Sequence, residues 1–144
     1  MLFADVHDYS KINHALGVDA YGFLQEMYEE LGDIIVEHCG TIVKYLGDAL
    51  LCVFPAGAEN KAVDCALKLR PAFAQLVSRR GLSVESELEI GIGSGQVAAG
   101  TFGHKSLRQW DVDGAVQTAK ARAAWLTGEW DAVCAKRAAL PLAV

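Results

Sequence analysis

The chain has 144 residues, a hydrophobic fraction of 52% and a formal net charge of −5 at pH 7. This length fits one domain, or most of one. The acidic balance argues against a nucleic-acid-binding protein held by phosphate contacts, and no nucleic acid partner is expected. It does not exclude a nucleotide ligand, because metal ions can mediate such a contact.

The chain lacks the sequence signals of membrane insertion or secretion. No apolar run approaches the roughly 20 residues that a membrane span needs. The N-terminal stretch MLFADVHDYS has neither the basic start nor the long apolar core of a signal peptide. We therefore expect a cytoplasmic protein or a piece of a larger one. The cysteines show no CxxC spacing and lie in apolar stretches, so we expect reduced core residues rather than a zinc site. They are Cys39, Cys52, Cys65 and Cys134.

The first half of the chain predicts a strand, a helix and a hairpin. Residues 1–6 are predicted to form a short strand. Residues 12–38 carry apolar residues at helical spacing, and Gly40 is the predicted stop. Residues 41–54, TIVKYLGDALLCVF, predict two strands joined at Leu46-Gly47-Asp48.

The second half predicts a helix, a glycine-rich strand pair and a last helix. Residues 58–79 return to helical spacing, and we expect Pro71 to kink or split that helix. Residues 86–103 alternate and are rich in glycine, which is typical of a strand pair with tight turns. A last helix is expected over 114–126. The order β-α-β-β-α-β predicts an α+β fold of the ferredoxin-like (split βαβ) type, an antiparallel sheet with helices packed mainly on one face.

Two carboxylates are expected to converge at one edge of this sheet. Asp5 ends the first strand, and Asp48 lies in the hairpin turn beside it. Like charges so placed repel unless a cation lies between them, and magnesium prefers such oxygen ligands. The alternative is that Asp48 only serves the turn, where aspartate is common.

Lys44 lies four positions before Asp48, in a predicted strand that is otherwise mostly apolar. It either extends its ammonium group to the sheet edge or contacts a ligand that lies across the sheet.

Four segments in register resemble one known family. They are LFADVHDYS, KYLGDALLCVF, IGIGSGQVAAGTFG, and WDVDG followed by a helix with an arginine. Together they resemble the catalytic domain of class III nucleotidyl cyclases, the adenylate and guanylate cyclases. The resemblance covers residues 1–126, which we expect to be one domain. Residues 127–144 form an atypical tail or the truncated end of the same domain.

The resemblance implies a two-metal site and a base-reading pair. Asp5, Asp48 and the backbone carbonyl of Val6 match the ligands of two Mg²⁺ or Mn²⁺ ions that bridge the triphosphate of the substrate. Lys44 and Asp111 match the residues that select adenine, whereas guanylate cyclases tend to have a glutamate at the lysine position. The adenine-selecting pair implies ATP as the substrate. Family members work as dimers with shared sites, so the resemblance also implies a homodimer. An upstream sensor domain, which this chain does not contain, is a further partner implied.

The last predicted helix matches the family less well. Counting from Gly114, the positions that orient the ribose and stabilise the phosphate are occupied by Thr118 and Arg122. If one residue is missing there, Gln117 takes the place of the ribose-orienting asparagine instead.

Two further departures concern phosphate binding. Asp8 stands where a glycine is usual in the turn that faces the phosphates. The lysine that grips the triphosphate has no recognisable match after residue 126.

Asp5, Asp48, Lys44 and Asp111 together predict an adenylate cyclase that converts ATP to 3′,5′-cyclic AMP and pyrophosphate. The alternative is a weakly active or inactive cyclase-like domain that binds nucleotide or serves as a dimerisation or regulatory module. The chain lacks the GG(D/E)EF run of diguanylate cyclases. The stretch GIGSG does not open a helix, so it is not interpreted as a dinucleotide-binding turn.

Overall fold

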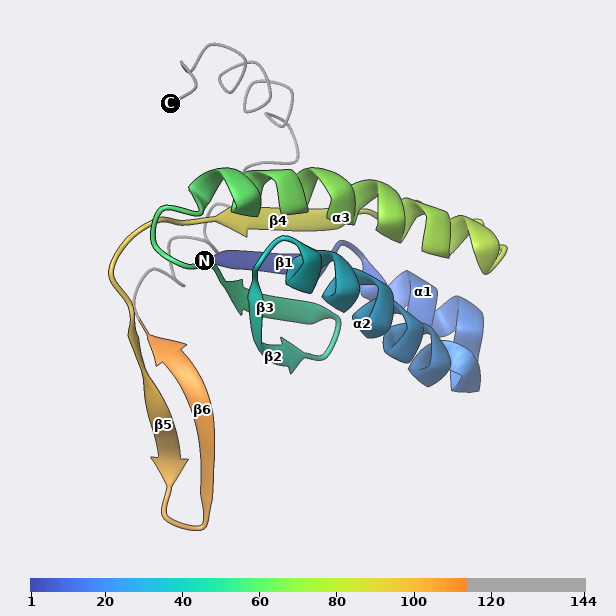
Figure 1. Ribbon diagram of the computed structural model, residues 1–144. Helices are drawn as coiled ribbons and strands as arrows, with labels where there is room; N and C mark the ends of the chain where they lie inside the picture. The colour runs from blue at the N-terminus through green and yellow to red at the C-terminus, as the bar shows by residue number, and fades with distance from the viewer. Residues whose placement is uncertain (114–144) are drawn as a thin grey trace.

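The computed structural model describes residues 1–113, which form a four-stranded antiparallel sheet, three α-helices and a separate two-stranded hairpin (Figure 1). In chain order the elements are β1 (Leu2–Val6), α1 (Tyr9–Leu16), the short 3₁₀ helix η1 (Gly17–Asp19), α2 (Ala20–Glu37), β2 (Thr41–Leu46), β3 (Ala49–Val53), α3 (Glu59–Arg79), β4 (Leu88–Ile92), β5 (Ala98–His104) and β6 (Leu107–Asp113). The sheet order is β2-β3-β1-β4 and every neighbouring pair is antiparallel. The predicted ferredoxin-like α+β fold is confirmed.

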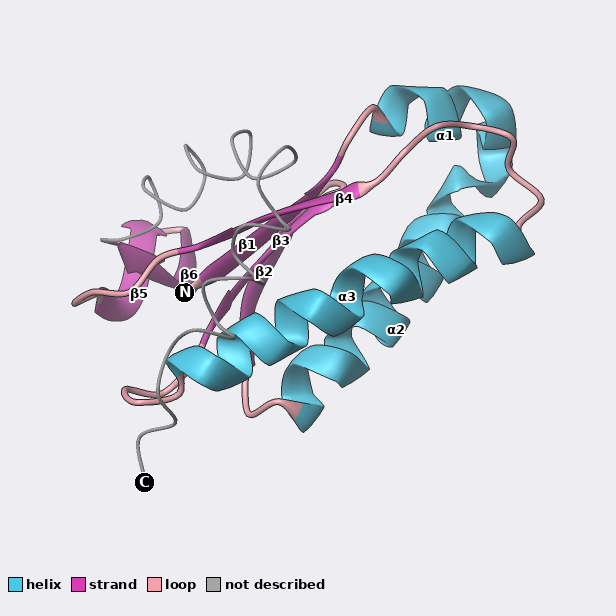
Figure 2. Cartoon of the chain, turned by 90° about the horizontal axis from the view of Figure 1, so that it is seen from above, coloured by secondary structure: helices cyan, strands magenta, loops and turns pink. Residues whose placement is uncertain are grey.

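The main core lies between the sheet and the helices. Figure 2 shows α2 and α3 side by side along one face of the sheet. On β1 the alternate residues Leu2, Ala4 and Val6 point to that face and are at most 4% exposed, as the period of two in a strand requires. Phe23 of α2 meets Phe73 of α3 edge to face, with ring centroids 6.3 Å apart. Burying each ring contributes about 1.5–3 kcal/mol to folding, so this pair fixes the helix layer.

A smaller apolar cluster lies on the opposite face of the sheet. Phe3 of β1 packs there with Ala49 and Leu51 of β3. Val112 of β6 joins them and is 6% exposed. The β5–β6 hairpin extends away from the sheet (Figure 1), but its second strand contacts β2. The end of β6 is therefore held against the face of the sheet opposite α2 and α3.

Two predictions about helices are wrong. The single helix over 12–38 is instead α1, η1 and α2, with a break at Gly17, whose φ of 56° lies in the left-handed region. The apolar spacing continues across this break, which is why it predicted one helix. Tyr21, one of the apolar residues at this spacing, is 77% exposed. Of the predicted kink or split at Pro71, the split is wrong, because α3 is continuous from Glu59 to Arg79.

The predicted strand pair in residues 86–103 is also wrong. β4 pairs with β1, whereas β5 pairs with β6 in a sheet of their own. The predicted segment does contain β4 and nearly all of β5, but each of them pairs with a strand outside it. The segment between β4 and β5 is thus a connection between two sheets rather than a hairpin turn.

The described cysteines differ in their exposure to solvent. Cys52 and Cys65 are buried, and burial raises the pKa of both thiols, that of Cys65 to about 12. They are inert core residues, as predicted. Cys39 is exposed, so its predicted place in the core is wrong. Cys134 lies outside the described residues. Within residues 1–113, no helix has the length and apolar character needed to cross a membrane.

Gly40 provides a test of the close packing between α2 and β2. A Cβ at this position would lie 2.6 Å from Ile35 Cγ2 and 3.0 Å from Phe54 Cε1. We expect Gly40→Ala to lower the free energy of unfolding by about 1–3 kcal/mol, because both neighbours must move. The control is Gly22→Ala, whose nearest contact is Arg80 Nη2 at 3.9 Å and which gains helix propensity. Urea unfolding measures both variants, and equal midpoints for Gly40→Ala and the wild type would contradict this packing.

Candidate active site

An irregularity in β2 determines the direction of Lys44. Ile42 pairs with Cys52 and Lys44 pairs with Leu51, so Val43 is an extra residue in a β-bulge. Ile42 and Cys52 belong to the core on the helix side. Leu51 belongs to the cluster on the other face. Lys44 therefore lies on the face opposite the helices. Without the bulge, regular alternation would turn its side chain toward them.

On that face Lys44 forms an ion pair with Asp111 of β6. Lys44 Nζ donates a hydrogen bond to Asp111 Oδ2 across 67 positions of sequence. The second carboxylate oxygen accepts the backbone N–H of Val112 at 2.8 Å. The bond from Lys44, followed by that from Val112, lowers the pKa of Asp111 below its usual value. The two residues that the family resemblance pairs are thus in direct contact.

Asp5 lies on the same face of the sheet, near the end of β1. It is two residues from Phe3, and alternation places both side chains on the face away from the helices. In the register of β1 and β4, Asp5 lies directly opposite Glu89. His7 Nδ1 donates a hydrogen bond to Glu89 Oε1 at 2.9 Å. Sequence reasoning missed Glu89, since only the β1–β4 pairing reveals that it faces Asp5.

Asp48 occupies the second position of the two-residue turn between β2 and β3. Gly47, at the first position, has a φ of 67°, which fits the type II′ turn favoured in such hairpins. Ala4 pairs with Leu50, and continuing this register by two residues places Val6 beside Asp48. The side chain of Val6 is buried in the core and has no donor atom, so Val6 can offer a cation only its backbone carbonyl.

Two tyrosines of the helix layer lie near the Asp48 carboxylate. Burial raises the pKa of Tyr9 and of Tyr28, and the negative charge of Asp48 raises both further. The hydroxyl of Tyr28 donates a hydrogen bond to the backbone carbonyl of Gly47. The turn that carries Asp48 is therefore attached to α2 as well as to the sheet.

The donor set at this edge fits a hard divalent cation. Asp5 and Asp48 offer carboxylates and Val6 a carbonyl, and all three are oxygen donors of the kind that Mg²⁺ and Mn²⁺ prefer. In residues 1–113, no three His, Cys, Asp or Glu side chains gather into a group able to hold a metal ion. A cation here would therefore complete its coordination with water or with oxygens of a bound substrate.

The turn after Asp5 carries an additional negative charge. Asp8 has a φ of 55°, in the left-handed region where glycine is most easily accommodated. Its Oδ2 accepts a hydrogen bond from Lys11 Nζ at 2.6 Å, and this bond lowers the pKa of Asp8. A cavity of about 390 Å³ opens beside this turn, lined by both of these residues, His7 and residues 85–87. Lys11 thus balances part of the charge that Asp8 brings to the turn.

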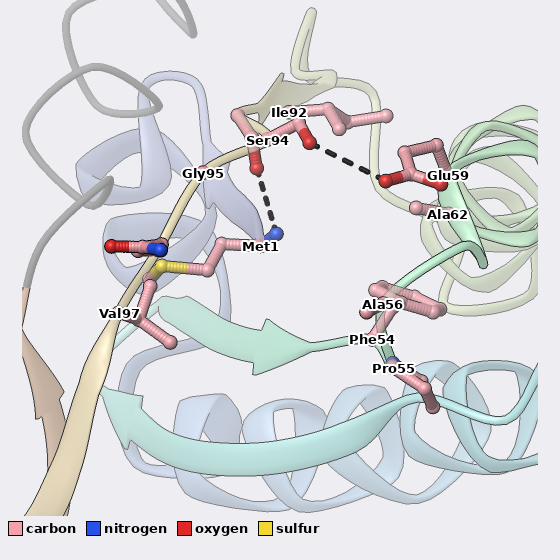
Figure 3. Close-up of a pocket in the computed structure, with 12 residues that line it drawn as sticks. Met1, Phe54, Pro55, Ala56, Glu59, Ala62, Ile92, Ser94, Gly95 and Val97 are labelled. Carbon is pink, nitrogen blue, oxygen red and sulfur yellow. Dashed lines mark hydrogen bonds between the residues drawn. The ribbon is translucent and has the colours of Figure 1, made fainter.

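Another pocket, of about 400 Å³, lies at the opposite end of β1 (Figure 3). The amino group of Met1 donates to the carbonyl of Gly93 at 2.8 Å, and Ser94 Oγ donates to Glu59 Oε1 at 3.5 Å. Met1 and Asp5 are four residues apart along a strand, roughly 13 Å. This pocket is therefore separate from the edge that carries the carboxylates. The predicted positions Thr118, Arg122 and the alternative Gln117 lie outside the described residues.

Comparison with known proteins identifies the family. Residues 1–126 match the family described as "Adenylate and Guanylate cyclase catalytic domain". The chain belongs to this family. An adenylate cyclase of Anabaena cylindrica is 28% identical over 113 residues, which cover 74% of this chain and 22% of that protein. The chain therefore spans about a fifth of the length of that relative.

Solved cyclase structures share the fold. The guanylyl cyclase Cya2 superimposes with a TM-score of 0.76 at 25% identity, over 86% of this chain and 68% of that one. The adenylyl cyclase CyaB from P. aeruginosa gives a TM-score of 0.74 at 22% identity, over 83% of this chain and 67% of that one. A guanylyl cyclase and an adenylyl cyclase thus share this architecture. The fold of this cyclase domain therefore does not define its substrate.

The Lys44–Asp111 pair can be tested by titration. We expect Lys44→Met to raise the pKa of Asp111, because the main cause of its lowering is removed. Carbon NMR of the Asp111 carboxyl measures this change. A carboxyl with a lowered pKa stabilises the fold above its unfolded pKa, near 3.9. That stability is lost as pH falls through the folded value, so the wild type should lose more stability below about pH 4 than Lys44→Met.

The matched control is Lys105→Met, an exposed lysine at the turn of the same β5–β6 hairpin. It should leave the Asp111 titration unchanged. An Asp111 pKa that is the same in Lys44→Met and in the wild type would refute the ion pair.

Proposed function

We propose that this cyclase domain is an adenylate cyclase that converts ATP to 3′,5′-cyclic AMP and pyrophosphate as a homodimer. The observation that carries the proposal is the ion pair between Lys44 and Asp111. It joins a cation and an anion on the face of the sheet opposite α2 and α3. The same face carries Asp5 near the end of β1.

The pair is complementary to adenine. An ammonium group only donates hydrogen bonds, so Lys44 would donate to N1 of the ring. A carboxylate only accepts, so Asp111 would accept from the exocyclic N6 amine. Guanine presents the reverse pattern, a hydrogen on N1 and a carbonyl at C6. In the free protein Lys44 donates its hydrogen bond to Asp111. In the complex adenine would accept a hydrogen bond from Lys44 and donate one to Asp111.

The edge beside Asp48 would hold the triphosphate. Asp5, Asp48 and the Val6 carbonyl would hold two Mg²⁺ or Mn²⁺ ions. Such ions activate the ribose 3′-hydroxyl and neutralise charge on the leaving pyrophosphate. In the reaction the 3′-oxygen forms a bond to the α-phosphorus, the bond from that phosphorus to the β-bridging oxygen breaks, and the hydroxyl proton is released. These side chains thus fix the position at which the attacking and leaving oxygens lie in line.

Thr118 and Arg122 are proposed for the ribose and the phosphate. Positions i and i+4 share one face of a helix. Arg122 would donate to phosphate oxygens, for which a guanidinium is well suited. Thr118 offers a hydroxyl to the ribose.

The proposed homodimer is supported by exposed apolar side chains on and beside the β5–β6 hairpin. Their exposed fractions are 37% for Val97, 44% for Phe102, 67% for Leu107 and 48% for Trp110. By the register, Phe102 and Leu107 lie on one face of the hairpin and Trp110 on the other, and such exposed apolar side chains on a projecting element are typical of a surface that a partner covers. We propose that a second copy covers them. One copy would then supply Asp5 and Asp48 while the other supplies Lys44 and Asp111.

The second candidate is a weakly active or inactive cyclase-like domain that binds nucleotide or mediates dimerisation. Asp8 favours it, because a carboxylate in the turn next to Asp5 repels a triphosphate. Its ion pair with Lys11 reduces this repulsion, which is why we prefer the enzyme.

Cyclic AMP production from ATP and Mn²⁺ tests the activity. We expect the wild type to form cyclic AMP, with little product from GTP. Asp48→Asn should reduce the rate roughly 100-fold or more, because a metal ligand supports several kcal/mol of transition-state stabilisation. The control is Asp19→Asn, an exposed aspartate in η1, which should retain full activity. No product from a folded, dimeric wild type would favour the second candidate.

Mixing two inactive variants tests the shared sites. Asp48→Asn and Lys44→Met should each be inactive as homodimers. In an equal mixture half of the dimers carry one copy of each, and one of their two sites contains no substitution. We expect the mixture to recover about a quarter of the wild-type activity, as two-fold symmetry requires. No recovery after the subunits have exchanged would contradict sites built from both copies.

A further inference from the structure

We propose that Tyr28 is a positioning residue for the divalent cation, because its hydroxyl holds the hairpin turn that carries Asp48. This inference rests on the proposed function. Tyr28 lies on α2, in the helix layer, and does not belong to the set of residues that would contact the substrate. It would act only through the backbone of the turn.

The contact joins α2 to the carbonyl directly before Asp48. The Tyr28 hydroxyl donates to the carbonyl of Gly47 across 19 positions of sequence. This carbonyl belongs to the peptide unit whose nitrogen is that of Asp48. Fixing its orientation therefore restricts the backbone from which the Asp48 carboxylate extends.

A second tyrosine keeps the Tyr28 ring in place. Tyr45 stacks on Tyr28 with ring centroids 4.0 Å apart and an interplanar angle of 27°. The bulge at Val43 is what turns Tyr45 to the helix side, since Tyr45 pairs with Leu50 of the main core.

Gly32 makes room for this stack. A Cβ on Gly32 would lie 3.4 Å from Tyr45 Oη and 3.3 Å from Ile42 Cδ1. Tyr28 and Gly32 are four residues apart on one face of α2. The helix thus provides both the stacking partner and the space for Tyr45, and the two rings are held between α2 and the end of β2.

The pairing of Leu46 with Ala49 closes the turn from the sheet, and the Tyr28 hydroxyl adds a support from the helix layer. Gly47 has the widest conformational freedom of any residue type, and nothing lies within 4 Å of the position of its absent Cβ. A tyrosine hydroxyl has a pKa near 10, and burial raises that of Tyr28 further, so the hydroxyl is protonated and able to donate at neutral pH.

The size of the effect follows from the strength of one hydrogen bond. If the turn leaves its binding conformation for part of the time, the apparent dissociation constant rises as the inverse of the fraction that remains in that conformation. A hydrogen bond of this kind contributes about 0.5–1.5 kcal/mol. We therefore expect the loss of the hydroxyl to weaken cation binding roughly three- to tenfold.

Tyr28→Phe isolates the hydroxyl, because it keeps the ring and its stacking on Tyr45. The full chain is titrated with Mn²⁺ alone, and free Mn²⁺ is followed by electron paramagnetic resonance. We expect a Kd three to ten times that of the wild type, a Tm within a few degrees of it, and faster hydrogen exchange at the amides of Asp48 and Ala49. The matched control is Tyr21→Phe, which removes a hydroxyl from an exposed position on the same helix and should leave the Kd unchanged.

Asp48→Asn separates failure of this inference from failure of the proposed function. If Asp48→Asn loses Mn²⁺ binding while Tyr28→Phe binds as tightly as the wild type, the metal site stands and the role of Tyr28 is refuted. If the wild type binds no Mn²⁺, or Asp48→Asn binds it equally well, the proposed metal site fails and this inference with it. A Tyr28→Phe protein that does not fold, or that loses stability with an unchanged Kd, would show that the hydroxyl only supports the fold.

Discussion

One extra residue in β2 determines which face of the sheet the β2 residues after it point to. Up to Ile42 the strand alternates regularly with β3, and after Val43 the alternation is reversed. In a regular strand Lys44 would point into the helix layer, where removing an unpaired ammonium group from water costs several kcal/mol. With the bulge, Lys44 reaches Asp111 on one face and Tyr45 reaches Tyr28 on the other. A single insertion thus supplies both the charged pair and the aromatic stack.

One face of the sheet carries most of the apolar core, and the other face carries the charged residues of the candidate site. The helix side buries most of the core, including Phe23 and Phe73 in direct contact. Within residues 1–113, the other side carries a smaller apolar cluster, and the charged residues Lys44 and Asp111 lie there. Both charges stand on strands rather than on loops, so backbone pairing fixes their positions before any ligand arrives. The core provides this rigidity without any charged group having to be buried in it.

Features encoded locally could be predicted from the sequence, whereas those set by distant pairing could not. The β2–β3 hairpin was predictable because Gly47 supplies a positive φ and apolar strands flank it. The break at Gly17 was not, because apolar spacing continues on both sides of it. Glu89 stands in an ordinary alternating strand, and its position opposite Asp5 depends on the choice of β1 as partner. The contact of Lys44 with Asp111 was suggested only by the family resemblance.

The place of β2 in the sheet explains why the bulge is tolerated. In the order β2-β3-β1-β4 it is an edge strand and pairs within the sheet with β3 alone. An extra residue there disturbs one ladder of hydrogen bonds, whereas in β1 it would disturb two. The exposed edge also leaves space for β6 to approach and bring Asp111 to Lys44. The edge strand is therefore where this fold can change the direction of a side chain at low cost, and both the charged pair and the support of the Asp48 turn originate there.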